Sequence, residues 1–307
     1  MSDDIFHLHP LLTYHGNDYH CSMAPIHTFS GALDRMEGER LALLGIRGQR
    51  DLDPDLAYLL MERRWKAKAE PRWAKLDELL ETRESTATEM AQAFRSEEAQ
   101  AQLASAIKDL GEDNVAIPPI FGLADYSKGM SRLLRETGRN VFEVVTPMSL
   151  PGLRLQAAME RAAMAQGCRL LRGREVISLH VEGDVARYAI LRSPTRQRVV
   201  KFNSVIVATG DAVGGGMRVI GRTMHDPFAS FRVGLFKEGE ARPMAAAEES
   251  GYLVGNDMRL ISVEGAHLRN VFGAGAALAG FSFPTGVGLG GSLITAYVAA
   301  QSAEEIS

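Results

Sequence analysis

Strand-like and helix-like hydrophobic patterns follow one another along the chain. A short apolar run at 40–46 predicts a buried strand, and a second strand is expected at 141–145. Helical spacing predicts helices at 128–137 and 153–166, each followed by a glycine that can end it. This alternation of strands and helices is typical of an α/β fold.

The stretch from 52 to 110 is expected to be mainly helical, as an insertion into that fold. Thr86 and Glu89 have the spacing of a capping box, which predicts a helix start. Ser96 is expected to cap a second helix. The prolines after residue 115 instead predict extended chain at 115–122, because a residue that precedes proline avoids the helical conformation.

The second half of the chain predicts a small antiparallel meander followed by two apolar strands that each end in a glycine turn. The expected strands are 169–171, 175–181, 186–191, 204–208 and 270–274, with a turn at 182–184 and a final helix at about 292–305. Apolar strands of the parallel type with glycine turns at their carboxyl ends indicate a nucleotide-binding domain.

Residues 1–36 have no clear period and are expected to be an irregular lead-in, with the α/β domain at 37–307. The lead-in contains five of the eight histidines, and with Cys21 these could in principle bind a metal. Their spacings match no standard zinc pattern, so we predict no metal site.

Composition narrows the class of protein. Of the 307 residues, 46% are hydrophobic and 23% charged, which is ordinary for a globular protein. A net charge of −4 gives no case for binding nucleic acid. Two cysteines exclude a disulfide framework, and no apolar run reaches the length of a membrane span. The start of the sequence does not resemble a signal peptide, so we expect a cytoplasmic protein.

Glycines mark the candidate binding loops. Five of the thirty lie within 205–221 and seven within 273–291. Thr209 and Gly210 follow a predicted buried strand, at the sheet edge where α/β folds bind ligands; the alternative is an ordinary glycine turn. The glycine run up to 291 precedes a helix whose first amides would attract an anion or a polarised carbonyl; the alternative is tight packing.

Two further features leave alternatives open. The run 286–291 formally fits G-x-G-x-x-G, but it follows no clear strand and only sixteen residues come after it. It therefore cannot open a βαβ dinucleotide-binding unit. Arg154 lies early in a helix, where a positive side chain opposes the helix dipole. It would either bind an anionic ligand such as a phosphate or form a structural pair.

Several segments together resemble the B subunit of the anaerobic glycerol-3-phosphate dehydrogenase, a flavoprotein family. They occur in the family's order over about 24–305. The matching segments are IHTFSGALD at 26–34, LGIRGQRD at 44–51, ATE at 87–89, PPIFGLAD at 118–125, TPMSLPGLRLQ at 146–156, VATG at 207–210, GGG at 214–216 and NVFGAGAALAGF at 270–281 with the glycine run to 291.

The resemblance implies a flavin, FMN or FAD, and electron transfer from sn-glycerol 3-phosphate to a quinone or another respiratory acceptor. It implies a Rossmann-like FAD/NAD(P)-binding fold, incomplete at the N-terminus because an irregular segment stands in place of the usual glycine-rich opening. It also implies a catalytic partner subunit and an iron–sulfur subunit that docks the complex at the inner membrane. The residues carried over as flavin-binding are Ser30, Gly31, Thr209, Gly210, Gly275, Ala276, Gly286, Gly288, Gly290 and Gly291.

His27 matches a family histidine just before the Ser-Gly step, and with Arg154 it is our candidate for a catalytic role. A packing or hydrogen-bonding histidine is the alternative. For the chain as a whole, the first alternative to an oxidoreductase subunit is a non-catalytic, truncated or scaffolding paralogue. A flavin oxidoreductase of the fumarate-reductase-like class is the second alternative.

Overall fold

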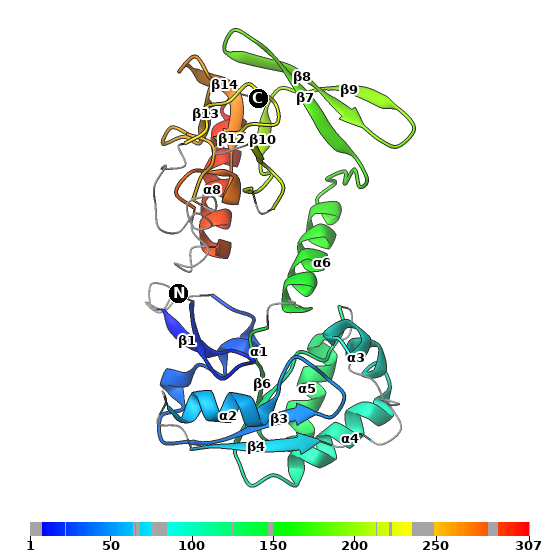
Figure 1. Ribbon diagram of the computed structural model, residues 1–307. Coiled ribbons are helices and arrows are strands. Elements are labelled where there is room, and N and C mark those ends of the chain that lie inside the picture. Colours follow the sequence, from blue (N-terminus) through cyan, green and yellow to red (C-terminus); the bar gives the residue numbers. More distant parts are fainter. Residues whose placement is uncertain are drawn as a thin grey trace. The chain divides into compact units, whose positions relative to one another are not determined.

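The chain folds into two compact units, Met1–Leu170 and Leu171–Ser307, each of which we describe by itself. The structure is a computed structural model, drawn in Figure 1. It describes residues 8–21, 23–63, 65, 68–74, 76, 85–123, 126–146, 150–212, 214–220, 223–234, 249–281 and 288–306. The boundary expected at residue 36 therefore lies inside the first unit, and the boundary after Leu170 is not among those expected from the sequence.

The first unit is built around a four-stranded parallel sheet with strand order β4-β3-β5-β6. Its elements are β1 (His9–Leu12), β2 (Asp18–Cys21), α1 (Ile26–Phe29), the 3-10 helix η2 (Leu33–Arg35), β3 (Arg40–Ile46), α2 (Pro54–Glu62), β4 (Lys68–Ala74), α3 (Ala87–Ala93), α4 (Glu97–Lys108), β5 (Asn114–Ile117), α5 (Tyr126–Thr137), β6 (Asn140–Glu143) and α6 (Leu150–Ala165). The predicted mixed α/β class with a parallel sheet is confirmed.

Helices cover both faces of this sheet. Successive side chains of β3 point to opposite faces, so neighbouring residues of this strand contact different helices. Leu43 packs with Met61 of α2 on one face. Leu44 packs with Leu103 of α4 and Met130 of α5 on the other face. All of these side chains are almost completely buried, so the apolar run at 40–46 reads as a strand covered on both sides. The strand has the predicted bounds.

The described part of the lead-in, residues 8–21 and 23–36, contains regular elements, so the expectation of an irregular segment is wrong for these residues. β1 and β2 form an antiparallel hairpin. The backbone of this segment joins the chain just beyond β6, where the Val145 amide donates to the Leu12 carbonyl oxygen at 2.9 Å and the Tyr14 amide donates to the Val145 carbonyl oxygen at 2.9 Å. Leu12 and Leu33 are buried against the sheet. Because contacts with distant parts of the chain hold this segment, its sequence shows no helical or strand periodicity from which the elements could be predicted.

The segment 52–110 is not mainly helical throughout, since it contains β4. This strand pairs in parallel with β3 from Arg40 opposite Lys68 to Ile46 opposite Ala74. It lies at the edge of the sheet, where Pro71 costs no hydrogen bond to a further strand. Because β4 contains charged residues and a proline, it has no apolar run from which a strand could be predicted. The predicted capping box is confirmed, with both reciprocal bonds between Thr86 and Glu89, and so is the Ser96 cap of α4.

The second unit combines an antiparallel meander, β7-β8-β9, with a sheet of order β10-β14-β13 and a hairpin, β11-β12. Figure 1 shows the meander as long green strands. The elements are β7 (Glu175–Glu182), β8 (Val185–Arg192), β9 (Gln197–Lys201), β10 (Val205–Val207), β11 (Arg218–Ile220), β12 (Thr223–His225), β13 (Arg259–Ile261), β14 (His267–Gly273), the 3-10 helix η3 (Gly275–Ala277) and α8 (Gly288–Glu304).

The predicted meander turn is confirmed, with Gly183 at a φ of +61° between β7 and β8. The parallel pairing of the two apolar strands is also confirmed, since Val205 lies opposite Val271 and Val207 opposite Gly273. A strand at 169–171 is not present, and this stretch instead connects α6 to β7. Within the described residues, no helix is both long and apolar enough to cross a membrane.

Candidate functional site

Two predicted binding loops of the second unit meet at one sheet edge. β10 and β14 are adjacent and parallel, so the residues that follow them, Thr209–Gly210 and Gly275–Ala276, lie at the same carboxyl edge. Gly210 and Gly275 have φ values of +82° and +67°, which side chains rarely adopt. The Gly275 amide donates to Thr295 Oγ1 of α8 at 2.9 Å, which ties this edge to the last helix.

The first turn of α8 contains three of the predicted glycines, Gly288, Gly290 and Gly291. Among the residues that the structure describes, none outside the helix's own backbone lies within 4 Å of a Cβ atom added at Gly290, so the helix surface there is open to that extent. The Gly291 carbonyl oxygen accepts a hydrogen bond from Thr295 Oγ1 at 2.7 Å. Gly286 lies outside the described residues. Of this run, Gly290 is therefore a position where the described residues leave space for a ligand.

The glycine loop after β10 closes on itself. The buried Asp211 carboxylate accepts the Gly214 amide at 2.6 Å. A Cβ atom at Gly216 would collide with the Gly210 carbonyl oxygen, so only glycine fits there. Packing thus explains Gly216 without a ligand, and the positive φ of Gly215, +80°, explains that glycine by backbone conformation.

An apolar cavity of about 240 Å³ lies along β10, with Thr209 among its lining residues. The meander supplies one wall with Leu179 and Leu191, and β10 supplies the other with Ile206. The volume is below the roughly 300–1,000 Å³ of pockets that enclose a drug-sized ligand. The cavity is therefore suited to one apolar ring system and not to a whole dinucleotide.

A buried tyrosine supports Thr209 in the lining of this cavity. Tyr252 donates its hydroxyl to Asp226 Oδ1 at 2.9 Å. Burial, followed by the nearby Asp226 charge, raises the pKa of this phenol, and a hydrogen bond from Thr209 opposes the rise. Tyr252 therefore stays neutral and acts as a fixed donor. The sequence gives no local signal for this pair, because 26 residues separate the two side chains.

The first unit contains a buried ionic cluster around Arg154, at the carboxyl edge of its parallel sheet. Arg154 Nη1 lies 2.6 Å from Glu143 Oε2, and Nη2 lies 3.0 Å from Oε1. The guanidinium also donates to the Phe121 carbonyl oxygen from Nε at 2.9 Å and from Nη2. Of the two interpretations left open, the geometry therefore matches a structural pair.

His27 and Arg154 are brought to the same aromatic ring. The Arg154 guanidinium lies 3.9 Å from the Tyr126 ring centroid, and His27 approaches that ring edge-on, with centroids 5.7 Å apart. Burial, followed by the Arg154 charge, lowers the pKa of His27. Burial, followed by the Glu143 charge, raises the pKa of Tyr126 to about 12. At neutral pH the imidazole is therefore an uncharged base beside a protonated phenol.

Ser30 and Gly31 lie next to this cluster in the chain and pack on β6. The Ser30 carbonyl oxygen accepts Asn140 Nδ2 at 3.2 Å, and a Cβ atom at Gly31 would run into the Phe142 ring. Close packing thus explains Gly31 without a cofactor. The predicted site residues fall into two groups, with His27, Ser30, Gly31 and Arg154 in the first unit and the others in the second.

Sequence reasoning did not find Glu143 or Tyr126. Glu143 had one available signal, since it is a carboxylate inside the apolar stretch 141–145. A buried charge of this kind requires a partner. Tyr126 had no such signal. No group of three or more His, Cys, Asp or Glu that could hold a metal is found in the part of the chain that the structure describes.

By fold, then, the chain is a mixed α/β protein with glycine turns at the carboxyl edge of two parallel strands. Comparison with known proteins adds a relation. The chain is 27% identical over 202 residues to the B subunit of the probable anaerobic glycerol-3-phosphate dehydrogenase of Halobacterium salinarum, covering 63% of this chain and 47% of that protein. It is 27% identical over 207 residues to the B subunit of the anaerobic glycerol-3-phosphate dehydrogenase of Vibrio vulnificus, covering 62% and 46%.

The chain is therefore a distant relative of these B subunits, as the resemblance predicted, and it spans about half of their length. No family model matches it. Among solved structures, the reduced form of ornithine hydroxylase from Pseudomonas aeruginosa is 15% identical, covering 87% of this chain and 51% of that one, with a TM-score of 0.16. That score is too low to support any argument about fold or cofactor.

Proposed function

We propose that this chain is a subunit of a flavin-dependent oxidoreductase that converts sn-glycerol 3-phosphate to dihydroxyacetone phosphate. The conversion removes two electrons and two protons from the secondary alcohol, and a quinone or another respiratory acceptor receives the electrons. The distant relation to the B subunits named above is the observation that carries this proposal. Because those relatives are subunits of a larger enzyme, the relation also supports a heteromeric assembly, for which we propose a catalytic partner and an iron–sulfur subunit that docks at the inner membrane.

For the flavin we propose the carboxyl edge of β10 and β14. Thr209, Gly210, Gly275 and Ala276 would hold it together with the first turn of α8. Three features of this edge fit such a group: the apolar cavity beside Thr209, the open surface at Gly290, and helix amides that favour a negative or polarised group. When bound, FMN or FAD would accept the electrons of the alcohol and pass them on.

In this proposal the second unit is the carboxyl-terminal part of a Rossmann-like FAD/NAD(P)-binding fold. Ser30, Gly31 and Gly286 belong to the proposed flavin site through the family resemblance alone. His27 is proposed as a proton acceptor, because its lowered pKa keeps the imidazole neutral and able to take a proton near pH 7. Arg154 would act through His27, by keeping its pKa low, and would not contact the substrate.

The test is the absorption spectrum of the purified chain, alone and co-expressed with its partner subunit. We expect the visible bands of oxidised flavin, which chromatography of the released cofactor would assign to FAD or FMN. Thr209→Trp and Gly290→Trp should each abolish these bands, because both fill the space proposed for the cofactor. Thr195→Trp, in an exposed turn of the meander, is the matched control and should retain them. No flavin under any of these conditions would refute the proposal.

A scaffolding subunit without a flavin is the second candidate. The observation that favours it is that, among the described strands, β10 pairs on one side only, with β14. This candidate predicts stable association with the partner and unchanged turnover of the complex when Thr209→Trp is introduced. Loss of turnover with intact association would decide for the flavoprotein.

A further inference from the structure

A cavity of about 170 Å³ lies between α4 and α5 in the first unit, and none of its lining residues is among the predicted site residues. Its lining residues are Arg95, Glu97, Gln100, Lys128, Gly129 and Arg132. α4 leads into β5 and α5 follows it, and Phe94 before α4 and Gly129 of α5 both lie beside the ring of Phe121, which follows β5. Their first turns therefore lie at the carboxyl edge of the parallel sheet, which is the edge where α/β folds bind ligands.

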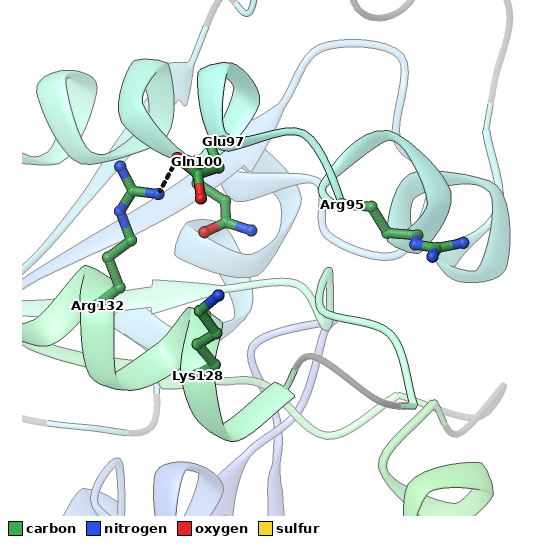
Figure 2. Close-up of a pocket in the computed structure, with 6 residues that line it drawn as sticks. Arg95, Glu97, Gln100, Lys128 and Arg132 are labelled. Carbon is green, nitrogen blue, oxygen red and sulfur yellow. Dashed lines mark ion pairs between the residues drawn. The ribbon is translucent and has the colours of Figure 1, made fainter.

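The lining is predominantly basic, with three cationic side chains and one carboxylate. In Figure 2, Lys128 and Arg132 extend from α5 toward Glu97 and Gln100 on α4. The Arg95 guanidinium points away from them in this view, so we assign it a contribution to the local potential and no direct contact. Lys128 forms no ion pair with any of the residues described.

Arg132 has one close carboxylate partner and one loose one, so its terminal nitrogens can still bind a ligand. Its Nε atom binds Glu136 at 2.7 Å, which fixes the guanidinium on α5. Its Nη1 atom is 3.6 Å from the Glu97 carboxylate, whose side chain is 79% exposed. A loose contact with so exposed a group contributes little to stability, and an entering anion could displace it. The terminal nitrogens of Arg132 and the Lys128 ammonium would then face the same anion.

We propose that this cavity binds a phosphate dianion, either free phosphate or the phosphate of a small monoester. The lining has three cationic side chains and one carboxylate, and the Glu136 carboxylate on Arg132 Nε removes a further part of the positive charge. The site remains net positive, which is complementary in sign to a phosphomonoester at neutral pH. The arginine fork and the lysine ammonium are common phosphate ligands, and the start of the twelve-residue helix α4 adds amide dipoles of the right sign. The volume is too small for a nucleotide.

Glu97 has a specific place in this proposal. In the free protein it partly neutralises Arg132, and it must give way when phosphate binds. Removal of its charge should therefore tighten binding, whereas removal of Lys128 or Arg132 should weaken it. The inference rests on the first unit alone and holds whether or not the second unit binds flavin.

Isothermal titration of the full chain with inorganic phosphate and with sn-glycerol 3-phosphate tests the site. We expect saturable binding of at least one of them, weakened about tenfold in Lys128→Gln and in Arg132→Gln. Glu97→Gln should bind more tightly. Arg135→Gln, on the same helix but outside the cavity, is the matched control and should bind like the wild type. Thermal unfolding of each variant checks that the fold is intact.

The two sources of phosphate are separated by the same titrations. Tighter binding of the monoester than of inorganic phosphate assigns a phosphorylated metabolite, and equal or weaker binding assigns free phosphate. Glycerol, which has no phosphate, should not bind in either case. Unsaturable titration by both anions, or unchanged affinity in Lys128→Gln, would overturn the inference.

Discussion

Replacement of Arg154 by methionine isolates the cost of burying the Glu143 carboxyl. In the wild type, the guanidinium pairs with Glu143, and both side chains are almost fully buried, with 8% and 0% exposed. Methionine keeps much of the arginine's length and removes its charge. The carboxyl must then either stay ionised without a partner or take up a proton, and at low dielectric the proton is the cheaper solution.

The magnitude follows from the ordinary pKa of glutamate, 4.5. Protonation of such a group at pH 7 costs about 1.36 kcal/mol per pH unit over 2.5 units, or about 3.4 kcal/mol, and at pH 5 only about 0.7 kcal/mol. In Arg154→Met the folded pKa of Glu143 lies far above the unfolded one. The folded state therefore binds the extra proton, and stability falls as the pH rises from about 4.5 toward that folded pKa.

We therefore expect Arg154→Met to be destabilised by about 3–5 kcal/mol at pH 7. The deficit relative to wild type should shrink by up to about 2.7 kcal/mol at pH 5. Burial also raises the pKa of Glu143 in the wild type, but Arg154 opposes that rise, so the wild type loses less stability over the same interval. The pH-dependent part of the difference thus measures what Arg154 contributes to keeping this carboxyl ionised.

Urea unfolding followed by tryptophan fluorescence is the assay, because the two tryptophans, Trp65 and Trp73, both lie in the first unit. The signal reports that unit and not the second. Arg135→Met is the matched control, since Arg135 is exposed, and should change stability by less than about 0.5 kcal/mol. An Arg154→Met deficit below about 1 kcal/mol at pH 7, or an equal deficit at pH 5 and pH 7, would refute this reasoning.

Three smaller perturbations test other parts of the first unit. Gly31→Ala should cost about 1–3 kcal/mol in urea unfolding, because its methyl group would overlap the Phe142 ring; no loss would mean that this contact relaxes freely. Thr86→Ala removes the capping box of α3 and should cost about 1 kcal/mol by the same measurement, with Ser as the variant that restores the cap. The His27 imidazole should titrate below the usual 6.5 in an NMR pH series, and its midpoint should rise in Arg154→Met, since the arginine charge contributes to the low pKa. If the titration midpoint of His27 did not change in Arg154→Met, burial alone would account for its low pKa.

The hydrophobic pattern of the sequence predicted correctly those elements whose burial determines their own residue types. The strand at 40–46 is covered by helices on both faces, so nearly every position is apolar and the pattern has sharp limits. The edge strand at 68–74 has one open side and contains a proline, so its composition resembles a surface segment. Arg154 shows the same limit at the candidate site, because its partners come from β6 and from the chain after β5.

Glycines mark the point where sequence reasoning about the binding loops stops. A glycine that a ligand approaches and a glycine that the protein's own chain approaches look alike in a sequence, since both exclude a side chain. At Gly216 the space for a Cβ is taken by the Gly210 carbonyl oxygen, whereas beside Gly290 it is open. A bulky residue at Gly216 would thus disturb the loop whether or not a cofactor binds, and the result could not be interpreted. At Gly290 the same change fills only space that no described atom occupies, so loss of flavin there, with stability retained, would identify the ligand's own position.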